Sequence, residues 1–187
     1  MNEELKKYFD TNKETWNQKV TIHRDSDFYD VDAFLKGETT LNPLEIEELG
    51  DVSGKDLLHL QCHFGLDTLS LERMGAICTG IDLSDEGIKE ARRLNELVKG
   101  NSTFIESNVY DVSENVPGEF DVVFTSYGVV GWLPDLDLWA RIIAEKLRPG
   151  GIFYMAEFHP IVWMFEYLDS PSKMKYPYLK GDVSNEV

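Results

Sequence analysis

Residues 56–65, which read DLLHLQCHFG, constrain the fold of this chain more than any other stretch. A short, mostly apolar run that ends in a turn is typical of a buried β-strand, and the chain then changes to helical spacing, with Leu66, Leu69 and Met74 on one face. A strand that turns directly into a helix places backbone N–H groups and the positive helix end at the carboxyl edge of a sheet. In open α/β sheets, ligands bind at this edge.

Strands and helices alternate after this unit. We predict further strands at residues 76–82, 103–107, 120–126 and 152–158, and helices at 84–98 and 135–147. Ser84 is the expected N-cap of the first of these helices, and residues 148–151, RPGG, are expected to end the second. This order of near-continuous apolar strands and helices predicts a parallel sheet that is covered on both faces.

The two ends of the chain have weaker patterns. We expect a helix over residues 3–18, an irregular segment over 20–36 with a short helix at 31–35, and a helix from Asn42-Pro43 to Gly50. Residues 160–168 are compatible with a helix, and residues 170–187 with a loop. The chain is therefore expected to be one domain, 1–187, with an N-terminal helical arm (1–50), a core (54–158) and a C-terminal region (159–187).

Composition excludes several classes of function. The formal net charge is −16, from 34 acidic and 18 basic residues, and an acidic surface repels nucleic-acid phosphates. The sequence contains no run of 18 apolar residues and no apolar segment typical of a signal peptide. Cys62 and Cys78 fall on segments expected to be buried. We therefore expect a reduced, cytoplasmic protein that acts on a small molecule, without a nucleic-acid or membrane partner; its oligomeric state is left open.

Three predicted strand ends converge on one crevice, at residues 61–65, 81–83 and 107–111. Asp82 closes the second strand, where a carboxylate can accept hydrogen bonds from a ribose diol; its alternative role is a turn or cap residue beside Ser84. Asn108 can bind an adenine edge or form an Asx-turn. A dinucleotide site requires a second glycine in the first turn, and His63 occupies that position, which argues for a nucleoside ligand without a pyrophosphate.

Four stretches together resemble the class I S-adenosylmethionine-dependent methyltransferases, in particular a bacterial group of the small-molecule type that has the pattern LLHLQCHFG. They are residues 57–65, residues 79–84 (TGIDLS), residues 120–128 (FDVVFTSYG) and residues 147–151 (LRPGG). The resemblance spans about residues 54–158. It implies a Rossmann-like three-layer α/β/α fold with sheet order 3-2-1-4-5 and S-adenosyl-L-methionine as cofactor.

The resemblance also implies roles for individual residues. By this resemblance, the first turn holds the methionine part of the cofactor and the end of strand two holds the ribose. The segment after strand three flanks the adenine. The end of strand four, with Tyr127, lies near the transferred methyl group. The implied cofactor-binding residues are Gln61, Cys62, His63, Gly65, Asp82, Leu83, Asn108, Val109, Tyr110, Thr125 and Ser126.

The sequence departs from the family pattern in two respects. The family has an acidic residue at the position of His59 and glycines at those of Gln61 and His63. The family's sheet ends with an antiparallel hairpin after strand five, and residues 159–187 do not contain two more strands. We therefore expect this chain to be a truncated product that lacks the hairpin.

A general base is needed only if the acceptor is protonated. The candidates are His63, Tyr127, Glu157 and His159, each of which can equally have a structural role. The aromatic residues of the arm are candidates for a lid over the site, the alternative being that they pack on the helices. The lid candidates are Trp16, His23, Phe28 and Tyr29.

The sequence disfavours a metal site and a nucleophilic cysteine. His59, Cys62, His63 and His159 contain neither a helical i, i+4 pair nor a CxxC spacing, so we predict no metal site, and Cys62 is expected to pack as a small apolar residue. The two alternative functions are a nicotinamide-dependent oxidoreductase and a non-catalytic Rossmann-like binding module. The sequence does not identify the methyl acceptor.

Overall fold

The computed structural model describes residues 3–165, 174 and 176–178. The chain divides into two compact units, Met1–Ala156 and Glu157–Val187. The first unit contains a sheet of five parallel strands in the order β3-β2-β1-β4-β5, which confirms the predicted fold. The strands are β1 (Asp56–Leu60), β2 (Ile77–Asp82), β3 (Thr103–Glu106), β4 (Phe120–Ser126) and β5 (Leu147–Ala156).

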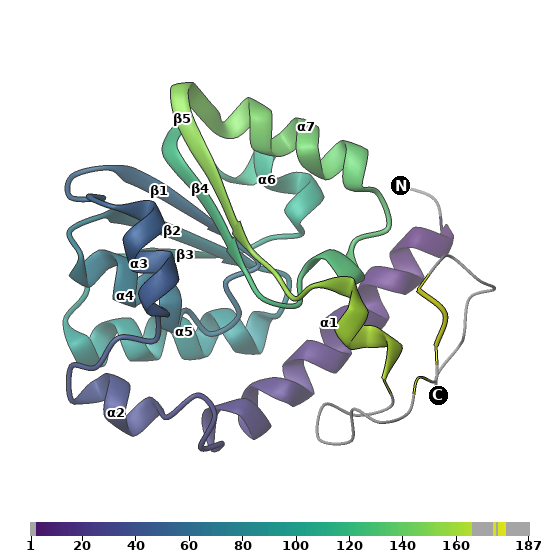
Figure 1. Ribbon diagram of the computed structural model, residues 1–187, viewed down its shortest axis with the longest axis horizontal. Coiled ribbons are helices and arrows are strands. Elements are labelled where there is room, and N and C mark those ends of the chain that lie inside the picture. Colours follow the sequence, from purple (N-terminus) through teal and green to yellow (C-terminus); the bar gives the residue numbers. More distant parts are fainter. Residues whose placement is uncertain (1–2, 166–173, 175, 179–187) are drawn as a thin grey trace. The chain divides into compact units, whose positions relative to one another are not determined.

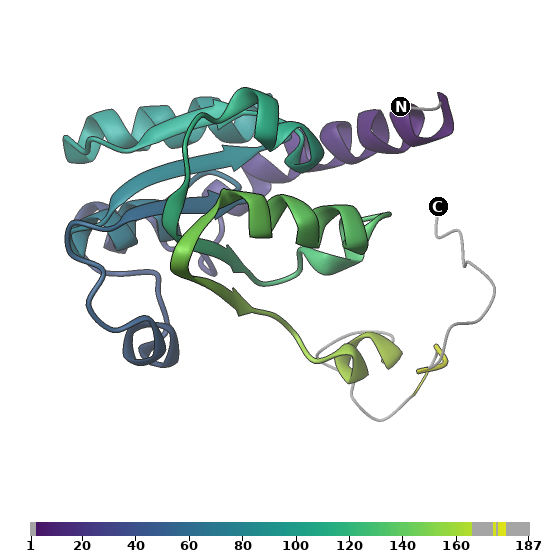
Figure 2. The ribbon, with the colours of Figure 1, turned by 90° about the horizontal axis from the view of Figure 1, so that it is seen from above.

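Helices cover both faces of this sheet (Figures 1 and 2). The α-helices are α1 (Glu3–Arg24), α2 (Val31–Leu35), α3 (Pro43–Leu49), α4 (Leu66–Arg73), α5 (Asp85–Val98), α6 (Val112–Asn115) and α7 (Leu136–Lys146), with 3₁₀ turns η1 (Val109–Asp111), η2 (Val130–Trp132) and η3 (Pro160–Met164). Leu58 and Leu60 of β1 face α6 and α7, whereas Leu57 faces α3 and α4. This alternation places an apolar core on each side of the sheet.

The predicted helix starts are confirmed by their caps. The Ser84 hydroxyl accepts a hydrogen bond from the Gly87 backbone N–H at the start of α5. Asn42 and Glu45 form a capping box at the start of α3, with Pro43 in the first turn. Asp135 caps α7 through the Leu138 N–H. These caps satisfy N–H groups that a helix end leaves without a partner.

The N-terminal helix was predicted too short. α1 continues to Arg24, through residues that we had assigned to an irregular segment. The β-branched residues at positions 20–22 disfavour a helix only slightly, and Val20 is buried. Tertiary packing therefore extends the helix to Arg24. Beyond this end, the Ser26 hydroxyl and N–H both donate to the His23 carbonyl.

The start and the end of strand five were also predicted wrongly. The RPGG segment, residues 148–151, is part of β5. Leu147 pairs with Phe120 and Ile152 pairs with Val122, so these four residues form an irregular loop opposite Asp121 alone. Arg148 in this loop forms ion pairs with Asp56 at 2.5 Å and Asp121 at 2.7 Å. The arginine thus joins the amino ends of β1, β4 and β5. At its other end β5 stops at Ala156.

The second unit departs from the prediction as well. The stretch expected to be a helix, 160–168, contains the short 3₁₀ turn η3 over Pro160–Met164, and residues 166–168 lie outside the described residues. Most of the loop expected at 170–187 also lies outside them. Among the described residues, no helix has the length and apolar character needed to cross a membrane.

Replacing Gly80 with alanine should destabilise the sheet. A Cβ at this position would lie 2.9 Å from the Phe104 ring and 3.0 Å from the Cys62 sulfur. Overpacking of this kind costs about 1–3 kcal/mol, so urea denaturation should show a lower midpoint for Gly80→Ala. Gly131→Ala is the control, since a Cβ there meets nothing within 4 Å. Equal midpoints for the two variants would contradict the packing described.

Candidate active site

The turn between β1 and α4 has a backbone conformation that normally requires glycine. Gln61, His63 and Gly65 have φ angles of 56°, 52° and 81°. A non-glycine residue in this region costs of the order of 1–2 kcal/mol. Two of the three positions thus keep a glycine-type backbone while carrying large side chains. Gly65 itself cannot be replaced, because a Cβ would lie 2.6 Å from the Phe104 ring.

Cys62 fixes the turn from inside. Its N–H donates to the Ile81 carbonyl at 2.8 Å, and its carbonyl accepts from the Gly65 N–H at 2.9 Å. The side chain is buried in the core cluster beneath the turn, and burial raises the pKa of the thiol well above its usual range. Cys62 therefore packs as a small apolar residue, as we expected.

Asp82 connects the end of β2 to this turn. One carboxylate oxygen accepts from the His63 N–H and the other from the Ser84 N–H, each at 2.8 Å. The side chain is 9 % exposed. Burial raises its pKa to about 6, although the backbone N–H groups oppose this shift. Asp82 thus has the cap-like contact with Ser84 that we considered, and it also holds the turn.

The segment after β3 is held by its own side chains. The Asn108 side-chain oxygen accepts from the Tyr110 N–H at 3.1 Å, the geometry of an Asx-turn. Val109 is buried in the core. The Tyr110 hydroxyl donates to the Asp135 carbonyl and accepts from the Asp135 N–H. Leu83, after β2, is partly buried.

The end of β4 carries three polar side chains. Thr125 is fully buried, and its hydroxyl donates to the Leu60 carbonyl at 3.4 Å. The Ser126 hydroxyl donates to Asp67 at 3.1 Å. The Tyr127 hydroxyl accepts from the Asn42 side-chain amide at 2.9 Å. The carboxyl end of β4 is thus joined to α3 and α4.

Helix α1 lies along the carboxyl edge of the sheet (Figure 1). Lys13 forms an ion pair with Glu106 at the end of β3, at 2.6 Å. The Asn17 side chain accepts from the Ser84 hydroxyl at 2.6 Å. The Tyr8 hydroxyl donates to the carbonyl of Trp132, beyond β4. The arm therefore contacts segments that follow three different strands.

The centre of the arm contacts the side chain of His63. His23 Nδ1 lies 3.0 Å from His63 Nε2, and the rings of Trp16 and Tyr29 lie 5.2 and 5.7 Å from the His63 ring. These four residues are termed the His63 cluster below. The exception among the lid candidates is Phe28, which is 84 % exposed and contacts only the Tyr29 ring of the cluster.

Burial, with smaller contributions from the charges of His23 and Lys19, lowers the pKa of His63 to about 3. An imidazole with such a pKa is a weak base at neutral pH. The low pKa therefore favours a positioning role for His63 over the role of a general base. Burial also lowers the pKa of His23.

The other two base candidates belong to the second unit. Glu157 lies beyond the end of β5 and not within the strand as we predicted, and one of its carboxylate oxygens accepts from the Phe158 N–H at 2.7 Å. His159 is the N-cap of η3 and accepts from the Ile161 N–H. Within the first unit, the remaining candidates are His63 and Tyr127.

His59 is buried beneath the turn. Its Nδ1 is 2.8 Å from the Thr68 hydroxyl, its ring packs edge-on against Phe124, and the residue is 1 % exposed. Burial lowers its pKa to about 3, so it is neutral. Across the described part of the chain, no group of three or more His, Cys, Asp or Glu side chains could hold a metal ion.

Two buried atoms of the turn have no hydrogen-bond partner, Gln61 Oε1 and His63 Nδ1. Buried polar atoms in folded proteins almost always have partners. Their position at the carboxyl edge therefore fits a ligand that supplies hydrogen bonds there.

Sequence reasoning missed two acidic residues near this edge, Asp67 and Glu45. Asp67 lies in the first turn of α4 and Glu45 in that of α3, where acidic residues are expected for helix stability alone. The sequence contained no signal that both helix starts bond to the end of β4, Asp67 to Ser126 and Asn42 to Tyr127.

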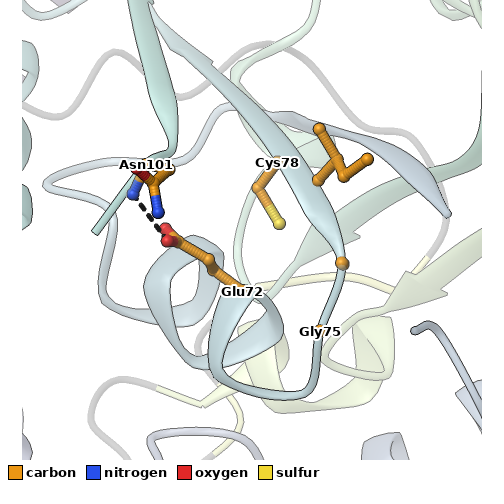
Figure 3. A pocket seen from close by; sticks show the side chains of 6 residues that line it. Glu72, Gly75, Cys78 and Asn101 are labelled. Carbon is orange, nitrogen blue, oxygen red and sulfur yellow. Dashed lines mark hydrogen bonds between the residues drawn. The ribbon is translucent and has the colours of Figure 1, made fainter. Parts of the chain in front are cut away.

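A separate hollow of about 270 Å³ lies at the opposite, amino edge of the sheet (Figure 3). It is lined by Glu72, Gly75, Ala76, Ile77, Cys78 and Asn101. The Glu72 carboxylate is already bonded to the Asn101 N–H at 2.6 Å. Because the hollow lies at the amino edge, it is remote from the β1–α4 turn and from Asp82.

Comparison with known proteins places this geometry in context. Residues 58–153 match the family model described as a methyltransferase domain. The ubiquinone biosynthesis O-methyltransferase of Xanthomonas euvesicatoria pv. vesicatoria is 32 % identical over 133 residues, which cover 69 % of this chain and 55 % of that protein. The Proteus mirabilis enzyme of the same name is 32 % identical over 154 residues, covering 72 % and 62 %.

Solved structures agree with the fold. An S-adenosylmethionine-dependent methyltransferase from Mesorhizobium loti is 25 % identical, with a TM-score of 0.57 over 70 % of this chain and 58 % of that one. The DhpI–SAH complex, at 19 % identity, has a TM-score of 0.61 over 80 % and 68 % and shows the fold alone. The chain spans 53 to 62 % of the length of the first three curated relatives.

The neutral state of His59 predicts a loss of stability in acid. The unfolded chain takes up a proton below pH 6.5, whereas folded His59 does so only near pH 3. Its contribution to stability therefore falls with decreasing pH, by up to about 1.4 kcal/mol per unit. Asp82 acts in the opposite direction below pH 6, because its folded pKa is raised.

The double variant His59→Leu/Thr68→Val isolates this effect, because it removes both partners of the buried hydrogen bond. Between pH 6.5 and pH 5 it should lose about 2 kcal/mol less of its unfolding free energy than the wild type. The measurement is urea denaturation at both pH values. Parallel pH profiles for the two proteins would show that His59 is protonated in the folded state.

Proposed function

Because the chain belongs to the methyltransferase domain family, we propose that it transfers a methyl group from S-adenosyl-L-methionine to a small-molecule acceptor. The observation that carries the proposal is the β1–α4 turn, whose glycine-type backbone at Gln61, His63 and Gly65 is fixed by the Asp82 carboxylate. The same unit combines backbone N–H groups, a helix N-terminus and a carboxylate at one sheet edge.

The residues fit a nucleoside cofactor. We assign the methionine part to residues 61–65, where Gln61 Oε1 and His63 Nδ1 lack partners. The Asp82 oxygens accept from the His63 and Ser84 N–H groups, and the Leu83 N–H also contributes, whereas a carboxylate offers about four acceptor sites. It can therefore still accept hydrogen bonds from a ribose diol. Residues 108–110 are assigned to the adenine, and Thr125 and Ser126 to the edge of β4 near the methyl group.

The protein's contribution to methyl transfer is mainly positional. The reaction is an in-line displacement, so most of the rate enhancement comes from holding donor and acceptor in line and excluding water. Helix α1 is placed to exclude water, since it covers the ends of the strands. Burial raises the pKa of Tyr127, so its hydroxyl is suited to orient an acceptor rather than to remove its proton.

Several features distinguish this proposal from the alternatives. The His63 side chain occupies the glycine position that a pyrophosphate would need, which disfavours a nicotinamide cofactor. The net charge of −16 disfavours a nucleic-acid acceptor. The names of the curated relatives support a hydroxyl group of a small molecule as the acceptor. The two free, buried cysteines support a cytoplasmic location.

Replacing Asp82 with asparagine should weaken S-adenosylmethionine binding at least tenfold. An amide oxygen carries no charge, and an amide has only one oxygen to accept the two backbone N–H groups and the ribose. Calorimetric titration of the wild type, of Asp82→Asn and of the exposed control Asp137→Asn measures this effect. Binding of NADH by the wild type without S-adenosylmethionine binding would overturn the methyltransferase proposal in favour of the oxidoreductase.

The His63 cluster predicts a role for Trp16 as part of a lid. Trp16 lies against His63 and, at 5.4 Å, against Trp132. Its replacement by alanine should speed cofactor dissociation about tenfold, equivalent to about 1.4 kcal/mol. Ile22→Ala, on the exposed side of α1, is the control. Equal dissociation rates for Trp16→Ala and the wild type in stopped-flow measurements would exclude the lid.

A further inference from the structure

A lysine ammonium contacts two tryptophan rings where the arm meets the segment after β4. Lys19 Nζ lies 4.8 Å from the centre of the Trp16 ring and 5.2 Å from that of the Trp132 ring. The two rings contact each other edge-on, with their centres 5.4 Å apart. Trp16 and Lys19 are neighbours on one face of α1, whereas Trp132 ends η2. These three side chains are termed the Lys19 group below.

Lys19 has no ion-pair partner in the described part of the chain. None of the ion pairs between described residues includes it, although the chain contains 34 acidic residues. Lys13, on the same helix, has Asp85 at 3.0 Å and Glu106 at 2.6 Å. An ammonium group has three N–H donors, and aromatic faces attract its charge without accepting as an anion does. Lys19 therefore retains the capacity to bind an anion.

The two histidines that Lys19 influences do not carry a charge of their own at neutral pH. The Lys19 charge contributes to the lowered pKa of both His23 and His63. Burial is the larger cause in each case, and the pKa of His63 is about 3. Both imidazoles are thus mainly unprotonated at pH 7. The positive charge of Lys19 therefore lies among neutral aromatic and imidazole rings.

The Lys19 group lies next to the segments to which the proposed function assigns the methyl donor. The Trp16 ring is 5.2 Å from the ring of His63 in the β1–α4 turn, and Trp132 belongs to the segment after β4. The methyl donor is itself a cation. A cationic acceptor would therefore add a third positive charge to this region, whereas an anionic acceptor is attracted by the two that are present.

The tryptophan rings indicate the shape of this anion. Trp16 and Trp132 are both half-buried, so each retains some accessible ring surface. Aromatic rings favour stacked or edge-to-face contacts with another ring. A planar aromatic ring that carries an ionised oxygen can thus contact the tryptophans while its oxygen accepts hydrogen bonds from Lys19 Nζ.

We infer that Lys19, Trp16 and Trp132 form an acceptor subsite that binds the ionised hydroxyl group of an aromatic ring, a phenolate. The choice of ligand rests on the proposed function. A positive charge beside a hydroxyl group favours its ionised form. The hydroxyl releases its proton to water on binding, so no side chain has to act as the general base. This agrees with the weak basicity of His63 and with the raised pKa of Tyr127.

Spectrophotometric titration with 4-nitrophenol tests the subsite, because only the ionised form of this probe absorbs strongly in the visible range. Lys19→Met removes the charge and keeps the length of the side chain, and Lys19→Arg keeps the charge. Lys6→Met is the matched control, since Lys6 is an exposed lysine of the same helix and its loss changes the net charge equally. 4-Nitroanisole, the neutral methyl ether of the probe, measures the ring contacts alone.

The wild type should lower the pKa of bound 4-nitrophenol below its value in free solution. It should also bind the phenolate about tenfold more tightly than 4-nitroanisole. Lys19→Met should lose the pKa shift and about tenfold in phenolate affinity, with 4-nitroanisole binding within about twofold of the wild type. Lys19→Arg and Lys6→Met should keep the shift. An unchanged shift in Lys19→Met, or tighter binding of phenyltrimethylammonium than of 4-nitrophenolate by the wild type, would overturn the subsite.

Calorimetry with S-adenosylhomocysteine separates this inference from the proposed function. A wild type that does not bind S-adenosylhomocysteine would contradict the methyltransferase proposal, whereas the 4-nitrophenol titration would still decide the subsite. Should Lys19→Met not fold, the wild type alone is sufficient. A lowered pKa of the bound probe then supports the subsite, and an unchanged or raised pKa overturns it.

Discussion

The hydrogen bond from the His63 backbone N–H to the Asp82 carboxylate is the interaction on which the candidate site depends. It joins the turn after β1 to the end of β2. A second hydrogen bond, from the Cys62 N–H to the Ile81 carbonyl, joins the same two segments one residue earlier. Because the turn is strained at Gln61 and His63, it needs such external contacts to persist. The carboxylate that can bind a ribose is thus the same group that maintains the turn.

The charges around this turn are distributed unusually for a site that binds a cation. His59 and His63 are both neutral, and burial raises the pKa of Asp82. Asp67 and Glu45 lie to one side, and burial raises the pKa of both of these carboxyl groups as well. Asp82 is nevertheless mostly ionised at neutral pH, because its raised pKa of about 6 still lies below 7. A sulfonium cofactor would thus meet neutral imidazoles beneath the turn and a carboxylate at the end of β2. Such a distribution orients a ligand that has its positive charge at one end.

Most of the sheet could be predicted from the sequence because each strand is a short apolar run and each helix start has its own cap. Ser84 is an example, since its side chain caps the start of α5 and can be recognised from the local sequence. The extent of α1 and the path of β5 could not be predicted. Both depend on partners distant in the chain: Val20 is buried by tertiary packing, and Arg148 is held by Asp56 and Asp121. Likewise, local sequence patterns identified Asp82 but not the pair Asp67 and Glu45.

The same distinction applies to the contacts of the arm. Trp16 and His23 are seven residues apart and share one face of α1. No local pattern places that face, or Tyr29, against His63, yet all three residues contact it. A glycine at position 63 would offer the arm no side chain to contact. The histidine at this position therefore fills the space next to the turn and gives the arm an aromatic side chain to contact. The imidazole of His63 is thus one of the contacts that hold the arm against the turn, beside those of Lys13 and Asn17.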